Sequence, residues 1–200
     1  MHEKLQWNDK GWPWEDYGPL INIAVQQNAI ITTGNISSAL LKKIYRQGSS
    51  TPELATARFN SMQSIPEQVK EKILDQVYES HCATMPKDKL TPMLNIQLAR
   101  DASMADAMIL SGETDEPQRT SILIAGSFHT QKNIGVPLHL HQLTDQPIKT
   151  LRLAEVREEH TKPGDYASDL ETDFIWFTPK QADIDYCAGL RSKVGSQHTP

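Results

Sequence analysis

The fold can be inferred outward from one short run, Ala29-Ile30-Ile31-Thr32-Thr33-Gly34-Asn35. Apolar and β-branched residues that end at a glycine are typical of a buried strand followed by a turn. Apolar residues at helical spacing precede this run between Pro19 and Gln27, and either Ser37 or Ser38 can cap a helix after it. Helix, buried strand, turn and helix in this order predict an α/β fold.

The rest of the chain continues this alternation around a helical middle. Helix starts are expected at Thr51-Pro52-Glu53 and at Ser64, where Glu67 completes a capping box. The further elements expected are a long helix at 88–111, strands at 121–125 and 150–156, a buried strand at 174–177, a helix at 137–143 and an exposed loop at 157–169. We therefore expect residues 1–200 to form a single α/β domain, with a mainly parallel sheet flanked by helices and a helical insert at 51–112.

Composition excludes several classes of function. The chain has 200 residues and a formal net charge of −5, and it contains no run of basic residues. Such a chain has no electrostatic footprint for nucleic acid or an anionic membrane. No apolar run reaches the roughly 18–20 residues that a membrane helix needs. The N-terminus is polar and lacks the apolar core of a signal peptide.

The sharpest local feature is Gly126-Ser-Phe-His129, which follows the strand expected at 121–125. Ligands of open parallel sheets bind beyond the carboxyl ends of the strands, so a histidine here is well placed. Its imidazole can ligate a metal or haem iron, or act as a general base. The alternative is a loop histidine that donates a hydrogen bond to a carbonyl group.

The long helix expected at 88–111 has two faces. One is an aliphatic stripe typical of a core, and the other carries Met93, Gln97, Arg100, Met104 and Met108. Methionines beside an amide and a guanidinium suit a pocket wall that binds a ligand carboxylate. The alternatives are a core or partner-helix surface for the methionines, and backbone contacts or a salt bridge for Arg100 and Asp101.

Other candidate residues have weaker patterns. His139 and His141 are two apart, so on a helix they point to nearly opposite sides, and we expect them to face solvent. Cys82 and Cys187 can pair, but their spacing is more typical of two small core residues. An aromatic group near the start forms either a packed cap or one wall of a pocket for a flat ligand; its members are Trp7, Trp12, Trp14 and Tyr17.

Five stretches in this order carry a resemblance to a known family. They are Trp12-Pro-Trp-Glu-Asp-Tyr17-Gly-Pro; Gly34-Asn-Ile-Ser37; His81-Cys82 leading to Gln97-Leu-Ala-Arg100-Asp101-Ala-Ser-Met104-Ala105; Ile124-Ala-Gly126-Ser-Phe-His129 with Gly135-Val-Pro137; and Asp173-Phe-Ile-Trp-Phe-Thr178-Pro with Asp185-Tyr-Cys187. The set resembles the ChaN-like haem-binding lipoproteins, which are related to the wider Tiki/TraB/erythromycin-esterase superfamily.

Two departures from the family pattern stand out. The family's opening strand, with its Gly-Glu-x-His motif, has no counterpart here, so we expect the first strands of the family fold to be absent. The export signal and lipidation cysteine would lie in the same missing part. The family usually has Gly-Asn-Gly-His where this chain has Gly126-Ser-Phe-His129, and Phe128 would crowd that loop.

The resemblance implies a non-catalytic haem-binding protein of iron or haem acquisition. It also implies a homodimer in the cell envelope, as an outer-membrane lipoprotein whose lipid anchor is missing from this chain. Family members are thought to hold haem iron through a tyrosine oxygen, which we map onto Tyr17, with His129 as a second iron ligand or hydrogen-bonding partner. The remaining cofactor-binding residues are assigned as Arg100 on a haem propionate, Met104 on the porphyrin, Gln97 and Trp14.

Two alternatives to haem binding remain open. One is a metal-dependent, hydrolase-like member of the superfamily in which His129 is a metal ligand or general base. That alternative needs a partner carboxylate and a second histidine, which relatives take from the opening strand. The other is a truncated fragment without function, because a shortened sheet exposes an unpaired strand edge.

Overall fold

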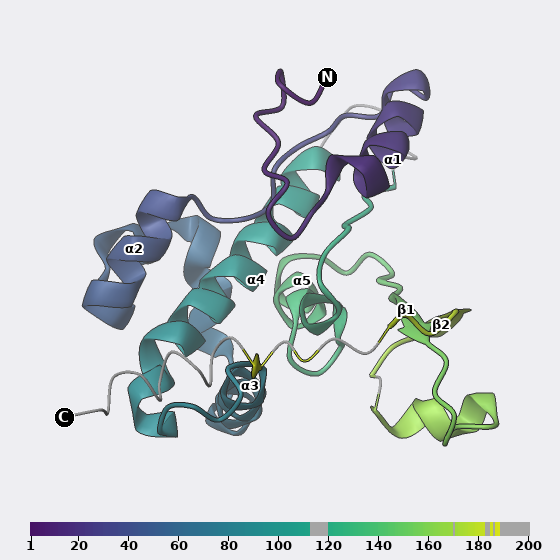
Figure 1. Ribbon diagram of the computed structural model, residues 1–200. Helices are drawn as coiled ribbons and strands as arrows, with labels where there is room; N and C mark the ends of the chain where they lie inside the picture. Colours follow the sequence, from purple (N-terminus) through teal and green to yellow (C-terminus); the bar gives the residue numbers. More distant parts are fainter. Residues whose placement is uncertain (113–119, 170, 183–184, 186, 189–200) are drawn as a thin grey trace. The chain divides into compact units, whose positions relative to one another are not determined.

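The computed structural model describes residues 1–112, 120–169, 171–182, 185 and 187–188 (Figure 1). The chain divides into two compact units, Met1–Thr33 and Gly34–Pro200. Tyr186, which belongs to the last of the resembling stretches, lies outside the described residues.

The first unit contains one helix and a cluster of aromatic rings. Helix α1 spans Trp14–Gln26, and the Asp9 carboxylate accepts a hydrogen bond from the Trp14 backbone N–H at 2.9 Å. The strand expected at 29–33 does not form, because these residues have no ladder partner in the described part of the chain. Ile30 is 58% exposed rather than buried.

The second unit is mainly helical. Its α-helices are α2 (Ser38–Gln47), α3 (Glu67–Ser80), α4 (Thr91–Gly112) and α5 (Val136–Leu143). Short 3₁₀ turns lie between these helices and, for the last one, between the two strands: η1 (Gly48–Ser50), η2 (Pro52–Ala55), η3 (Ala57–Ser64), η4 (Lys87–Leu90), η5 (Ser127–Thr130) and η6 (Pro163–Asp169).

Of two expected helix starts, the structure confirms one and contradicts the other. Ser37 is the N-cap of α2, and its hydroxyl oxygen accepts a hydrogen bond from the Leu40 N–H at 3.2 Å. The capping box expected at Ser64 is wrong, because Pro66 is the N-cap of α3 and no side chain caps that helix.

Helix α4 is the centre of the second unit (Figure 1), and α2, α3, α5 and η3 all pack against it. Three small residues on α4 are fully buried and let these neighbours approach closely: Ala99, Ala102 and Ala105. The aliphatic stripe expected on this helix is confirmed, since Leu94 and Leu98 lie in the core. This packing fixes the helix that carries most of the candidate site.

The sheet consists of two parallel strands, β1 (Leu151–Glu155) and β2 (Phe174–Thr178), paired in register from Leu151–Phe174 to Glu155–Thr178. The molecule is therefore α/β, as the sequence predicts, and the strands at the last two predicted positions are confirmed. The expectation that residues 174–177 are buried is wrong, because Phe174 and Trp176 are 57% and 63% exposed.

The opposite face of this sheet is covered by the segment expected to be an exposed loop. Tyr166, in η6, is 4% exposed and packs against Ala154 and Phe177. Its hydroxyl oxygen accepts a hydrogen bond from the Arg157 N–H at 2.6 Å. The segment between β1 and β2 is therefore not wholly exposed, because the buried Tyr166 side chain packs against the sheet.

Residues 121–125 were also expected to form a strand, and they are extended without a ladder partner among the described residues. Alternate side chains still point to opposite sides. Leu123 and Ala125 pack against the core, whereas Ile122 and Ile124 are 82% and 54% exposed. The extended backbone alone turns alternate side chains to opposite sides, but a strand also needs a hydrogen-bonded neighbour.

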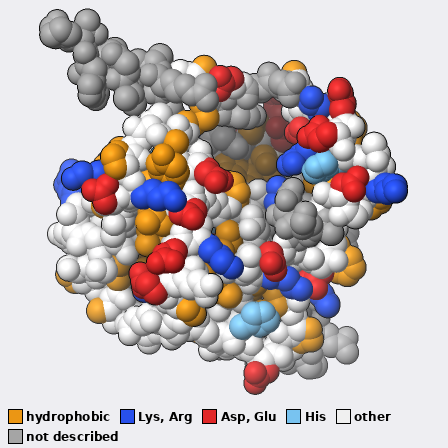
Figure 2. Space-filling model, turned by 90° about the horizontal axis from the view of Figure 1, so that it is seen from below, with side chains coloured by type: hydrophobic (Ala, Val, Ile, Leu, Met, Phe, Trp, Pro, Cys, Tyr) orange, Lys and Arg blue, Asp and Glu red, His pale blue; other side chains and the backbone are white. Residues whose placement is uncertain are grey.

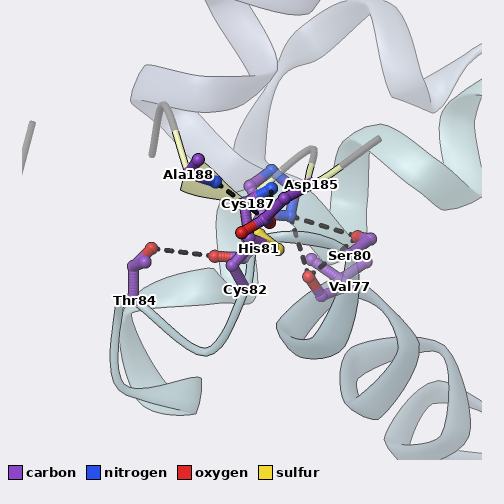
Figure 3. Close-up of a disulfide and its surroundings, with 8 residues drawn as sticks. All are labelled: Val77, Ser80, His81, Cys82, Thr84, Asp185, Cys187 and Ala188. Carbon is purple, nitrogen blue, oxygen red and sulfur yellow. Dashed lines mark hydrogen bonds between the residues drawn. A yellow bond between two sulfur atoms is a disulfide. The ribbon is translucent and has the colours of Figure 1, made fainter. Parts of the chain in front are cut away.

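The two cysteines form a disulfide, contrary to the expectation of two small core residues. Cys82 and Cys187 are 105 positions apart and join the end of α3 to a late segment of the chain (Figure 3). His81 lies beside the bond, and its Nδ1 is 2.8 Å from the Val77 carbonyl oxygen. The Asp185 carboxylate accepts hydrogen bonds from the backbone N–H groups of Cys187 and Ala188.

The surface carries charges of both signs. Figure 2 shows acidic and basic side chains interspersed over the face in view. Large apolar side chains are exposed as well, including Ile122 and Trp176. Within the described residues, no helix is both long enough and apolar enough to cross a lipid bilayer.

Candidate functional site

The candidate site is formed where the loop carrying His129 meets helix α4. Gln97 and Asp101 are four positions apart on α4, so they lie on the same side of the helix one turn apart. His129 Nδ1 is 2.5 Å from the Asp101 Oδ1 and 3.1 Å from the Gln97 amide nitrogen. The same amide is 3.4 Å from the Asp101 Oδ2. The His129 ring and the Gln97 amide thus both lie against the Asp101 carboxylate, which can accept a hydrogen bond from each of them.

Burial dominates the electrostatics of Asp101. The residue is fully buried, and burial raises the pKa of its carboxyl from 3.8 to about 6, while the hydrogen bond from His129 opposes this rise. The nearby Arg100 charge also lowers the pKa of Asp101. An ionised carboxylate can only accept a hydrogen bond, so the Nδ1 of His129 is the donor at neutral pH.

The other ring nitrogen of His129 is available to a ligand. The side chain is 17% exposed, and Nε2 has no hydrogen-bond partner in the described part of the chain. With the proton on Nδ1, Nε2 carries a lone pair. A buried carboxylate that orients an imidazole in this way supports metal or haem ligation, and equally general-base chemistry.

The start of α5 holds the His129 loop in place. The His129 N–H donates to the Gly126 carbonyl oxygen at 2.9 Å, and the Gly135 N–H donates to the Gln131 carbonyl oxygen at 2.9 Å. A Cβ atom at Gly135 would lie 2.3 Å from the His129 carbonyl oxygen. Only a residue without a side chain allows the two backbone segments to come this close.

Arg100 is beside this group and has an unsatisfied donor. Its Nε is buried without a hydrogen-bond partner, and its guanidinium group forms no hydrogen bond or ion pair with the described residues. A buried unpaired donor is costly, and such groups in native structures call for an explanation. An anionic ligand group is one such explanation.

The structure places the other assigned residues differently. Met104 is 5% exposed and packs in the core with Val136 and Leu140, so it corresponds to the core alternative for the methionine stripe. Its contact with a porphyrin stays a prediction. The Gly34 backbone also lies against this side chain.

Tyr17 and Trp14 belong to the first unit. The Tyr17 ring is 4.6 Å from the Trp12 ring and 6.3 Å from the Trp7 ring, measured between centroids. Its hydroxyl group has no hydrogen-bond partner among the residues described. The structure therefore brings together Gln97, Asp101 and His129, with Arg100 next to Asp101 in the chain. Trp14 and Tyr17 belong to the other compact unit.

Sequence reasoning missed Asp101 as a partner of His129. The partner carboxylate was expected only from the family's opening strand, yet this chain supplies one from α4. The available signal was the spacing of Gln97 and Asp101 on one helix face. The described residues contain no group of three or more His, Cys, Asp or Glu side chains placed to hold a metal ion.

The prediction that His139 faces solvent is wrong, although that for His141 is right. His139 is 1% exposed, and its Nδ1 lies 2.8 Å from the Ser61 hydroxyl oxygen of η3. Burial lowers the pKa of His139 to about 4. The helix turns the two histidines to opposite sides, and the inner one meets the core rather than water.

Comparison with known proteins gives one match. A family model described as "Haem-binding uptake, Tiki superfamily, ChaN" matches residues 1–140. The matched segment includes the whole group formed by Gln97, Asp101 and His129, and it ends within α5. No curated protein and no solved structure matches the chain.

Proposed function

The chain belongs to the ChaN family of haem-binding uptake proteins in the Tiki superfamily, and from this premise we propose that it binds haem as a non-catalytic protein of iron or haem acquisition. The observation that carries the proposal is the His129 imidazole, whose Nδ1 is held by Asp101 while Nε2 has no partner in the described chain. Histidine in this state is a common axial ligand of haem iron.

The residues around His129 fit an iron porphyrin in two respects. Nε2 offers a lone pair to iron, and the Arg100 guanidinium, which forms no hydrogen bond or ion pair with the described residues, offers donors to a propionate carboxylate. Binding a propionate would satisfy the buried Nε, which has no partner in the described part of the chain. When bound, the haem would supply the iron centre, and the protein would supply the ligand and the charge match.

Tyr17 is the second proposed iron ligand, through its phenolic oxygen. The hydroxyl group is unpartnered among the described residues, and the neighbouring rings, including that of Trp14, offer flat apolar surface to a porphyrin. Tyr17 and His129 belong to different units, so each is proposed and tested by itself.

We also propose a homodimer located in the cell envelope. The disulfide between Cys82 and Cys187 supports this location, because such bonds form and persist in oxidising compartments.

A haem titration of the full chain tests the proposal. Wild-type protein should give a saturable shift of the Soret band, and gel filtration should show a dimer on loading. His129→Ala and Tyr17→Phe, made separately, should each weaken binding or change the ligand-sensitive bands. His141→Ala, which removes an exposed histidine from α5, is the matched control. A flat titration of folded wild-type protein would refute haem binding.

The contact between Asp101 and His129 also favours a second candidate, a hydrolytic activity with His129 as general base. A base oriented by a buried carboxylate is the arrangement such chemistry requires. The test is hydrolysis of a panel of chromogenic esters and peptides, with and without added Zn²⁺. Turnover that survives in His129→Gln would rule out this role.

A further inference from the structure

The contact between Asp101 and His129 has a consequence for the oxidation state of the bound iron. We propose that Asp101 is a positioning residue that gives His129 partial imidazolate character, and so makes the site prefer ferric over ferrous haem. The inference rests on the proposed function, because it assumes that His129 Nε2 is an iron ligand.

The geometry fixes which ring nitrogen is free. Oδ1 of Asp101 lies 2.5 Å from Nδ1, within hydrogen-bonding distance, and a bond from an imidazole N–H to a carboxylate is charge-assisted. The Gln97 amide lies near both Asp101 Oδ2 and His129 Nδ1, at 3.4 and 3.1 Å, and restricts the carboxylate from its other side. The imidazole therefore donates through Nδ1 and presents Nε2 outward.

The environment keeps this interaction strong. Asp101 is fully buried, and the adjacent Ala102 on α4 is also fully buried, so water does not compete for the carboxylate. Electrostatic effects grow when solvent is excluded. The positive charge of Arg100 partly offsets the negative charge that the Asp101 carboxylate exerts on His129. A propionate paired with Arg100 would neutralise that positive charge.

The chemical effect follows from charge. A carboxylate that accepts the Nδ1 proton raises the basicity of Nε2, as partners of metal-bound histidines do. Ferric iron carries one more positive charge than ferrous iron, so a more basic, partly anionic ligand stabilises the ferric state more. Asp101 should consequently lower the reduction potential of bound haem.

The experiment uses the full chain with Asp101→Asn, which keeps the shape of the side chain and an acceptor oxygen but removes the charge. Affinity for haem is measured under air and after reduction with dithionite, and the midpoint potential is measured by spectroelectrochemistry. Ferric affinity should fall roughly tenfold or more, as for other outer-shell partners, with a much smaller change for ferrous haem. Such a tenfold difference corresponds to an increase of about 59 mV in potential.

Two further variants separate positioning from folding. Asp106→Asn removes another α4 carboxylate, one that faces Arg58 at 3.8 Å, and should leave the potential unchanged. Asp101→Glu should restore part of the wild-type potential. Nitrogen-15 NMR of the haem-free wild-type protein should show His129 with its proton on Nδ1.

The outcomes distinguish the two proposals. Absence of haem binding by the wild-type protein overturns the proposed function and this inference together. Haem binding with equal ferric and ferrous losses in Asp101→Asn, or no loss, overturns only the inference. A neutral His129 with its proton on Nε2 in the haem-free protein also overturns it.

Discussion

At Gly135 the backbone of α5 touches the loop that carries the candidate site, and a single methyl group is enough to test that contact. In Gly135→Ala the new Cβ would meet the backbone carbonyl oxygens of His129 and Phe128 at 2.3 and 2.9 Å. Backbone atoms cannot rotate away, so one of the two segments must move. We expect the free energy of unfolding to fall by about 1–3 kcal/mol, the usual cost of overpacking, as measured by urea denaturation.

Gly164→Ala is the control for this prediction. A Cβ at Gly164 meets nothing within 4 Å, so this change should leave stability almost unaltered. If both variants unfold at the same urea concentration as wild type, the close approach of α5 to the His129 loop is not present in solution.

His139 predicts how stability responds to acid. Burial keeps its folded-state pKa near 4, below the ordinary value of 6.5, so the unfolded chain takes up the proton first as the pH falls. The stabilisation is complete above pH 6.5 and is lost progressively as the pH falls to about 4. The loss attributable to this residue amounts to about 3 kcal/mol.

The test compares wild type with His139→Asn, which still offers a polar atom to Ser61 but does not titrate in this range. Asp101 acts in the opposite direction, because its raised pKa contributes stability at low pH that is lost as the pH rises through about 6. Its contribution cancels when the two proteins are subtracted at each pH. The stability advantage of wild type should shrink between pH 7 and pH 4, and a difference that is constant over this range would contradict the assignment.

The sequence pattern identified candidate site residues better than it identified the residues that they contact. His129, Gln97 and Arg100 were all candidates from local pattern, and the structure brings His129 and Gln97 together at Asp101. Asp101 stands next to Arg100 in the chain, yet its role depends on a residue 28 positions away that no local pattern relates to it. The disulfide between Cys82 and Cys187 escaped prediction for the same reason, because long-range pairing leaves no periodic signal.

At the scale of elements, helices were predicted more accurately than strands. Helices α4 and α5 satisfy their backbone hydrogen bonds internally, so the local sequence is enough to specify them within a few residues. A strand depends on a neighbour that can lie anywhere in the chain. The segment at 151–155 has such a neighbour at 174–178, whereas those at 29–33 and 121–125 have none in the described residues.

The N-cap of α2 gives a prediction at this scale. Ser37 satisfies the Leu40 N–H through its hydroxyl group, and Ser38 is the first residue of the helix. Ser37→Ala should lower the free energy of unfolding by about 1 kcal/mol, whereas Ser38→Ala should have a much smaller effect. Equal effects of the two changes in thermal denaturation would show that the hydroxyl group of Ser37 does not cap the helix.

At the scale of the whole molecule, the disulfide is the covalent link between distant parts of the chain. It closes a loop with a sequence separation of 105 residues, from the end of α3 to a segment beyond β2. Chain-entropy arguments assign a large stabilisation to such a long loop, because cross-linking removes many conformations from the unfolded state. The bond also ties the region that follows the sheet to the helical core.

We therefore expect reduction, or the double change Cys82→Ser and Cys187→Ser, to lower the free energy of unfolding by about 2–4 kcal/mol. Titration with a thiol reagent should find no free thiol in the denatured, unreduced protein and two after reduction. The double variant should keep its helical circular dichroism, because α2, α3, α5 and η3 pack directly against α4. Two thiols that react without reductant would show that the bond is absent. They would also remove the support that it gives to a location in an oxidising compartment.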